Sequence, residues 1–222
     1  MPKLYSEVLS GVLKILLISL VTLASLSWLG TLAYSLNEAF YVNYVYSVDN
    51  FIQIFANVLY YIVLVLYLIW IYRVHMDLNR LFPLYLRSPG MALACNLIPF
   101  FSFYGIPSVY SRIGHAFQGQ PSTSRAGSQI RGLAGPLIIL LIASNLTNRL
   151  AGNQNDPTVA GLLVAGGLSI LLYVVFLTLC LLVSRSVKTA SLRSAYSPVP
   201  DPEAEEWADD RLGSNTGSPL QG

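Results

Sequence analysis

Four stretches of the chain are apolar for about the length of a membrane span. They cover residues 12–35, 51–74, 132–150 and 158–183, and the second closes with an uninterrupted apolar and aromatic run from Leu64 to Ile71. Because an α-helix rises 1.5 Å per residue, a hydrocarbon core of about 30 Å needs about 20 mostly apolar residues. The pattern therefore predicts an all-α fold, an integral membrane bundle of four transmembrane helices within residues 1–189.

Between the second and third of these stretches lies a further apolar region. The second helix is predicted to continue past the membrane until Pro83 ends it. Residues 91–103 are apolar, but they are few and are interrupted by Pro99, with Pro107 beyond. A helix that is apolar on one side should follow, because apolar residues recur at spacings of three and four: Ile106, Val109, Tyr110, Ile113 and Phe117. We therefore predict an interfacial or re-entrant helical hairpin over residues 91–118 that caps the bundle.

This hairpin offers the surface that we expect to contact membrane lipids or a partner. Aromatic side chains and a basic residue beside a membrane face suit lipid headgroups or a neighbouring helix. The expected partners are membrane lipids, with another membrane protein or a second copy of the chain as the further alternatives. The candidate contact residues are Pro99, Phe100, Phe103, Tyr104, Tyr110 and Arg112.

Composition agrees with a surface that faces lipid. Hydrophobic residues make up 54% of the 222 residues and charged residues only 11%, against about 45–50% and about 25% in soluble domains. So few charges cannot cover a soluble protein of this size. The net charge of +2 gives no indication of nucleic-acid binding.

Basic residues are distributed unevenly along the chain. All 13 of them except Arg149 lie in the N-terminal segment, between the second and third spans, or in the C-terminal tail. Loops rich in Lys and Arg stay in the cytoplasm. The sequence therefore predicts that both termini and residues 73–131 are cytoplasmic. The aromatic cluster from Phe40 to Tyr46 then falls in an outer loop, as an interface belt or, alternatively, as an exposed docking surface.

A short motif precedes and enters the predicted hairpin. It consists of a Pro-Gly turn, a stretch with alanine, an Ile-Pro-Phe break and an aromatic pair: Ser88-Pro89-Gly90, Ala92, Ile98-Pro99-Phe100 and Phe103-Tyr104. These residues resemble the core signature of a family of bacterial multi-pass membrane domains of unknown function. The resemblance covers about residues 50 to 185, with Asn96 where the family has tryptophan and Ser102 where it has asparagine. It implies a bacterial cytoplasmic (inner) membrane, or an internal membrane, and no established activity.

Signatures of catalysis are absent from the sequence. No zinc-protease, phosphate-loop, dinucleotide-binding or serine-hydrolase motif occurs. His75 and Asp77 are two residues apart, so they point in different directions on a helix, and we expect both to lie near lipid headgroups. Cys95 and Cys180 have no disulfide or metal-ligand spacing. We therefore expect a protein that is not an enzyme and that uses no cofactor or metal.

Polar residues within the spans leave two functions open. The expected ionisable residues there are Lys14 and Arg149, both close enough to a span end to reach water, so no buried acid is predicted. Small and hydroxyl-bearing residues could pack helices together in a dry seam, which would indicate a structural, regulatory or partner-binding membrane component. If they instead face a common wet cavity, the chain is a small channel or transporter. These residues are Ser27, Thr31, Ser35, Gly132, Gly135, Gly161, Ala165, Gly166 and Gly167.

The C-terminal segment has a different character. After Pro202 it is acidic and polar and it ends in Gly, Ser and Asn. Such a composition has too few apolar residues to form a core. A disordered acidic cytoplasmic tail is predicted for residues 190–222.

Overall fold

The computed structural model describes residues 4–82, 85, 87–97, 99–153 and 158–196, without the side chains of 95–97, 99–104, 151–153 and 194–196. Every regular element in these residues is a helix. In chain order they are α1 (Glu7–Leu36), α2 (Glu38–Phe40), the π-helical turn η1 (Tyr41–Val45), α3 (Tyr46–Leu81), α4 (Pro89–Leu97), α5 (Pro99–Gln118), α6 (Ser124–Asn153) and α7 (Val159–Tyr196).

Four helical stretches in the described part of the chain are long and apolar enough to cross a membrane: Glu7–Leu36, Glu38–Leu81, Ser124–Leu150 and Val159–Arg193. Each contains one of the four predicted spans, except that the fourth helix begins one residue later than predicted. The prediction of an all-α membrane bundle is confirmed.

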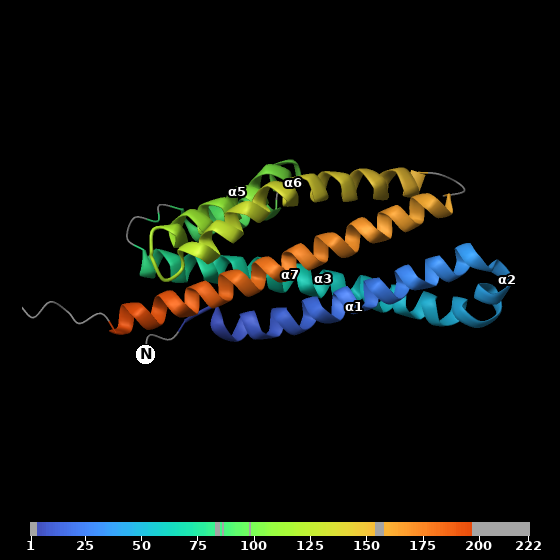
Figure 1. Cartoon of the computed structure of the whole chain (residues 1–222), viewed down its shortest axis with the longest axis horizontal. Helices are drawn as coiled ribbons and strands as arrows, with labels where there is room; N and C mark the ends of the chain where they lie inside the picture. The colour runs from blue at the N-terminus through green and yellow to red at the C-terminus, as the bar shows by residue number, and fades with distance from the viewer. Residues whose placement is uncertain (1–3, 83–84, 86, 98, 154–157, 197–222) are drawn as a thin grey trace, which may run out of the picture.

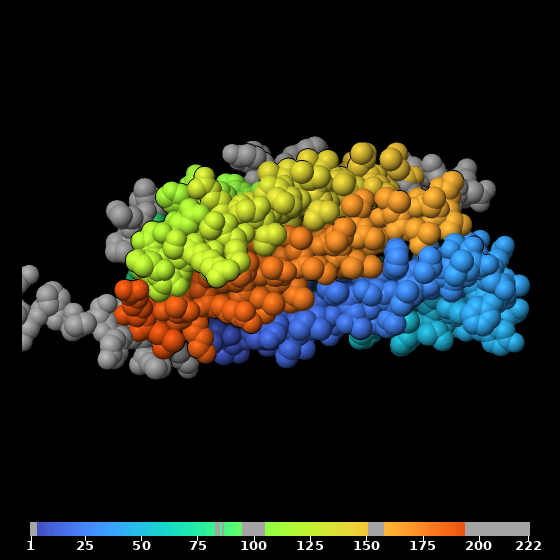
Figure 2. All heavy atoms as spheres, in the orientation of Figure 1, coloured from blue at the N-terminus to red at the C-terminus, as the bar shows by residue number. Residues whose placement is uncertain are grey.

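The helices lie along one another in an elongated bundle (Figure 1). α1 packs on both α3 and α7, α6 packs on α7 and α5, and α4 lies between α3 and α5, whereas α3 and α6 share no extensive contact. On the face shown in Figure 2, α7 fills the space between α6 and α1. We call the end with α2, η1 and the start of α7 the turn end, and the end with α4, the start of α1 and the end of α7 the cap end.

The predicted hairpin is a pair of helices, α4 and α5, at the cap end. Its amphipathic pattern is confirmed: Val109, Ile113 and Phe117 are fully buried against the bundle. Pro107 is buried inside an unbroken α5. Burial of this apolar face compensates for the one backbone hydrogen bond that a proline removes.

A close approach of two backbones joins α5 to α6. A Cβ atom added at Gly114 would lie 2.7 Å from the carbonyl oxygen of Gly127, and one added at Gly127 would lie 2.6 Å from the carbonyl oxygen of Gly114. By contrast, Gly132 and Gly135 have no atom within 4 Å of such a Cβ, so their expected role in close helix packing is wrong. The packing glycine of α6, Gly127, lies one to two turns earlier than expected.

The start of α1 is fixed to α3 by a buried carboxylate. Asp77 accepts hydrogen bonds from the backbone N–H groups of Tyr5 and Ser6, at 3.0 and 2.9 Å, and from the Ser6 hydroxyl at 2.7 Å. These donors lie at the N-terminus of α1, where no intrahelical acceptor is available and where negative charge is favourable. Trp70 adds a bond from its indole N–H to the Ser10 hydroxyl, at 2.8 Å. Because Asp77 and His75 are 1% and 0% exposed, their expected position near the headgroups is wrong.

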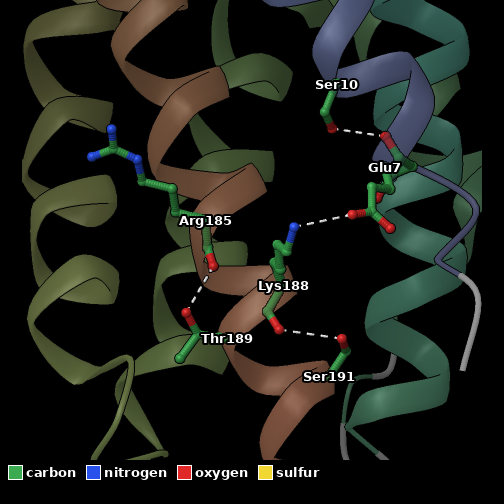
Figure 3. Close-up of polar contacts among 7 residues, drawn as sticks. Glu7, Ser10, Arg185, Lys188, Thr189 and Ser191 are labelled. Carbon is green, nitrogen blue, oxygen red and sulfur yellow. Dashed lines mark hydrogen bonds and ion pairs between the residues drawn. The ribbon is translucent and has the colours of Figure 1, made fainter. Parts of the chain in front are cut away.

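A second contact holds the start of α1 to the far end of α7. Figure 3 shows Lys188 pointing from α7 toward Glu7, with an N–O distance of 3.2 Å. Both side chains are more than half exposed, so this pair contributes little compared with the buried Asp77 bonds. The two contacts together place the ends of α1, α3 and α7 side by side.

Helix α7 continues beyond the boundary predicted for the tail. It runs to Tyr196, and Ala190 and Ser191 are buried at 2% and 6% exposure. The assignment of residues 190–196 to a disordered tail is therefore wrong, because these residues are helical and the first two of them are buried. Residues 197–222 lie outside the described part of the chain.

Candidate functional site

The structure separates the six hairpin residues predicted to contact lipid or a partner. Tyr110 is fully buried, and its hydroxyl donates to the hydroxyl of Tyr67 at 3.1 Å, so its prediction as a surface contact is wrong. It shares a face of α5 with the core residues. Arg112 lies on the other face and is exposed. The remaining four side chains lie outside the described residues: Pro99, Phe100, Phe103 and Tyr104.

A different feature dominates the described part of the bundle. A cleft of about 1540 Å³ lies among α1, α3, α6 and α7. It is larger than the roughly 300–1,000 Å³ of an ordinary small-molecule pocket. Since α3 and α6 share no extensive contact, the cleft is open to the side between these two helices. The exposed lining residues Leu64 and Tyr60 mark this opening.

The cleft is closed toward the cap end. Its deepest part is bordered by Tyr67, Phe176 and Ile106, and the rings of Tyr67 and Phe176 meet edge to face at 5.5 Å. Beyond this layer come side chains with no exposed surface, among them Trp70 and Ile71. The cleft therefore ends blindly on the packed core that α5 covers.

Polar and apolar residues are sorted by depth along the cleft. Its charged, amide and hydroxyl side chains other than tyrosine lie toward the turn end: Ser27, Thr31, Asp49, Asn50, Gln53, Asn57, Ser144, Asn145, Asn148 and Ser169. The deepest of them, Asn57, is eleven residues beyond Tyr46, the first residue of α3, which corresponds to about 16 Å of helix. Deeper than this the lining is aliphatic or aromatic, as at Leu17, Leu20, Val63 and Leu172.

Several of the hydroxyls in the cleft are already bonded within their own helices. Thr31 donates to the carbonyl of Ser27 at 3.2 Å, and Ser169 donates to the carbonyl of Ala165 at 2.9 Å. Asn145 likewise donates to the carbonyl of Leu141. Such a bond uses the single proton of a hydroxyl, whereas the Asn145 amide keeps a second N–H. The hydroxyls therefore make the wall of the cleft mildly polar without requiring hydrogen bonds to water.

Among the described residues that line the cleft, Asp49 is the only charged one. It lies in the first turn of α3 and is 3% exposed. The apolar pattern predicted a second span that begins at residue 51, after Asp49, and no buried acid. That expectation is wrong, because the connection from α1 is itself helical and α3 begins at Tyr46. Lys14 and Arg149, the ionisable residues expected within the spans, are both exposed and neither lines the cleft.

The side chains around Asp49 define a small polar site. One carboxylate oxygen, Oδ2, accepts from the Tyr41 hydroxyl at 2.7 Å and from the Gln53 amide at 2.9 Å. The other oxygen, Oδ1, is buried and has no hydrogen-bond partner. A Cβ at Gly30 of α1 would lie 3.0 Å from this carboxylate, so Gly30 provides the room it occupies. Asp49 also borders a groove of about 230 Å³ that is otherwise lined by apolar and glycine residues of α1, η1 and α3.

A second group of buried polar side chains lies at the cap end. The His75 ring nitrogen Nδ1 is 2.8 Å from the carbonyl oxygen of Ile71 and its Nε2 has no partner. The Tyr85 ring lies 5.7 Å from it, and burial raises the pKa of Tyr85 to about 12, so this phenol stays neutral. Arg87 donates to the Ser108 hydroxyl at 3.4 Å. These contacts hold the connection after α3 against α5, which is a structural role.

Comparisons with protein-family models, with curated proteins and with solved structures found no match to this chain. The class of protein therefore follows from the fold and the cleft alone. The chain is an all-α membrane protein. Within the described residues, no three His, Cys, Asp or Glu side chains are grouped so that they could hold a metal ion.

Proposed function

We propose that this chain is a membrane protein that binds a lipid of the surrounding bilayer in the cleft, as a partner-binding or regulatory component rather than as an enzyme. The polar headgroup occupies the turn end, and the acyl chains occupy the apolar part of the cleft. The lipid enters from the bilayer through the opening between α3 and α6.

The depth order of the lining residues carries this proposal. The polar part of the cleft extends from Tyr46 to Asn57, about 16 Å of helix, and the lining beyond it is apolar. A membrane lipid has the same order, polar at one end and apolar beyond. A water-soluble ligand would not require an aliphatic lining that is open on one side to the hydrocarbon region of the bilayer.

The same lining argues against the alternative of a channel or transporter. A polar path would have to continue through the layer of Tyr67 and Phe176 and past Trp70 to the cap end. Water or ions could not be stabilised there, because the side chains are closely packed and the Tyr67 hydroxyl and the Trp70 indole N–H are already hydrogen-bonded within the protein. A blind cleft with an apolar end supports binding.

The direction of the chain in the membrane is a further part of the proposal. Both described ends of the chain lie at the cap end (Figure 1), together with the basic segments, so we place the cap end in the cytoplasm. The motif that includes Pro89, Gly90 and Ala92 supports a bacterial inner membrane. The cleft then opens toward the outer leaflet.

Single cysteines test this orientation. In a background without Cys95 and Cys180, we expect Tyr44→Cys at the turn end to react with an impermeant maleimide added to intact cells. Ser122→Cys, between α5 and α6, should react only after the membrane is permeabilised. Labelling of Ser122→Cys in intact cells would place the cap end outside and would contradict the proposed direction.

Spin-label accessibility tests whether the deep part of the cleft holds lipid or water. We expect a nitroxide at Leu68, which lines the cleft, to collide with oxygen and not with a water-soluble nickel complex in liposomes. Ile69 is the matched control, because it is the next residue, is 42% exposed and lies outside the cleft. Both labels should give the same lipid-type ratio. Strong nickel access at Leu68 alone would indicate a wet path and would favour transport.

A further inference from the structure

Asp49 is a buried carboxylate without a cation. It is 3% exposed, it lies in a helix that crosses the membrane, and none of the described basic residues forms an ion pair with it. Acids in such positions are costly unless they are paired, and they commonly mark a binding site. Its two donors, Tyr41 and Gln53, both bond to Oδ2. The unpartnered Oδ1 has no accessible surface, so a ligand that donates to it has to displace the Gln53 amide or turn the carboxylate.

Two tyrosine rings line the cleft together with this carboxylate, and one of them bonds to it. Tyr34 and Tyr41 both line the cleft, and their rings meet edge to face with centroids 5.3 Å apart. The Tyr41 hydroxyl is the group that holds Asp49 in place. Electron-rich ring faces next to an acid attract an organic cation, with an attraction that grows when the cation leaves water. The carboxylate and the rings thus select the same kind of ligand.

We propose that Asp49, Tyr34 and Tyr41 form a binding site for the primary ammonium group of a lipid headgroup, as in an ethanolamine phospholipid. This inference rests on the proposed function, since the ammonium group belongs to the lipid in the cleft. The ammonium donates to Asp49 and lies against the tyrosine rings. The exposed Gln53 amide moves aside to make room for the incoming ammonium donor.

Charge and donor capacity distinguish ethanolamine from other headgroups. A trimethylammonium group keeps the attraction to the rings, but it has no N–H to give to Oδ1, which would stay unpaired at a cost in binding. A glycerol headgroup leaves the lipid with a net negative charge that Asp49 repels. The expected order of affinity is ethanolamine, then choline, then glycerol.

Competition between lipids of identical acyl chains tests the inference. The purified protein is mixed with ethanolamine, choline and glycerol phospholipids, and the bound lipids are identified by native mass spectrometry. We expect the wild-type protein to prefer the ethanolamine lipid over the glycerol lipid by about tenfold, which corresponds to about 1.4 kcal/mol. Asp49→Asn should bind lipid but should lower this preference to about twofold or less.

Glu38→Gln is the matched control. Glu38 is an exposed acid of α2 near the same end of the bundle and does not line the cleft, so its removal should leave the preference unchanged. An equal loss in Glu38→Gln would mean that surface charge, not the site, selects the headgroup. If Asp49→Asn does not fold, Tyr34→Leu takes its place, with a smaller expected loss of preference.

The outcomes separate this inference from the proposed function. Lipid that is retained by the wild-type protein without a headgroup preference, or with a preference that Asp49→Asn keeps, overturns the ammonium site alone. A wild-type protein that retains no lipid overturns the proposed function itself. Stabilisation by ethanolamine in the absence of any lipid, at concentrations where the lipid has no effect, would also contradict a lipid headgroup as the ligand.

Discussion

Gly127→Ala should destabilise the protein more than any other single-methyl change in the described bundle, by about 3 kcal/mol. The added Cβ would lie 2.6 Å from the Gly114 carbonyl oxygen and 2.7 Å from the Gln118 backbone nitrogen. Both neighbours are backbone atoms, so the strain cannot be relieved by a rotamer change. Helices α5 and α6 would have to separate, which would open the contact around the fully buried Phe117 and Ile130.

Thermal unfolding in detergent measures this effect against a control in the same helix. We expect the melting temperature of Gly127→Ala to fall by about 6–12 °C. Gly132→Ala should have the opposite sign or no effect, because its Cβ meets no atom within 4 Å and alanine favours a helix. Equal shifts in the two variants would mean that the close approach of α5 and α6 is not as described.

The four spans and the capping helix could be predicted because each depends on local pattern. Apolar length identifies a membrane helix, and Pro83 agrees with the end of α3 at Leu81. The spacing of Val109, Ile113 and Phe117 gave the buried face of α5. The spacing does not identify the element that packs against that face. Tyr110 was therefore assigned to a surface, although it lies in the core against Tyr67.

The sequence pattern does not predict the buried acid, because the first long apolar run of the second span begins after Asp49. Asn37 accepts a hydrogen bond from the Phe40 backbone at 3.0 Å, which starts a helical turn immediately after α1 and brings Asp49 into α3. One signal for this was present in the sequence. Asp49, Gln53 and Asn57 are four residues apart, so a helix places them on one face, and this face lines the cleft.

Small residues gave an incomplete prediction of helix packing. Gly166 does lie at a close contact, since a Cβ there would be 2.7 Å from the Trp28 ring, whose indole N–H donates to the Leu163 carbonyl oxygen. Ser27 and Thr31 instead line the cleft. A stripe of small residues can face either a helix or a cavity, and only the arrangement of α1, α3 and α7 decides between them.

The second large effect is expected from filling the cleft where its polar part meets its apolar part. Ala56 and Ser169 both line the cleft, and each lies ten residues beyond the start of its helix, at Tyr46 and Val159. They are therefore at a similar depth, about 15 Å from the turn end. Tryptophan at both positions would occupy the path of the acyl chains. The control is the pair Val58→Trp and Val174→Trp, because both valines are exposed outside the cleft.

Native mass spectrometry of these proteins, purified from membranes in mild detergent, tests the central claim most directly. The wild-type protein and the Val58→Trp, Val174→Trp control should each carry a lipid that survives removal of the detergent. The Ala56→Trp, Ser169→Trp protein should retain about tenfold less, a loss of about 1.4 kcal/mol in binding, while it remains folded. Equal lipid retention in all three proteins, or no lipid on the wild-type protein, would contradict a lipid-binding cleft.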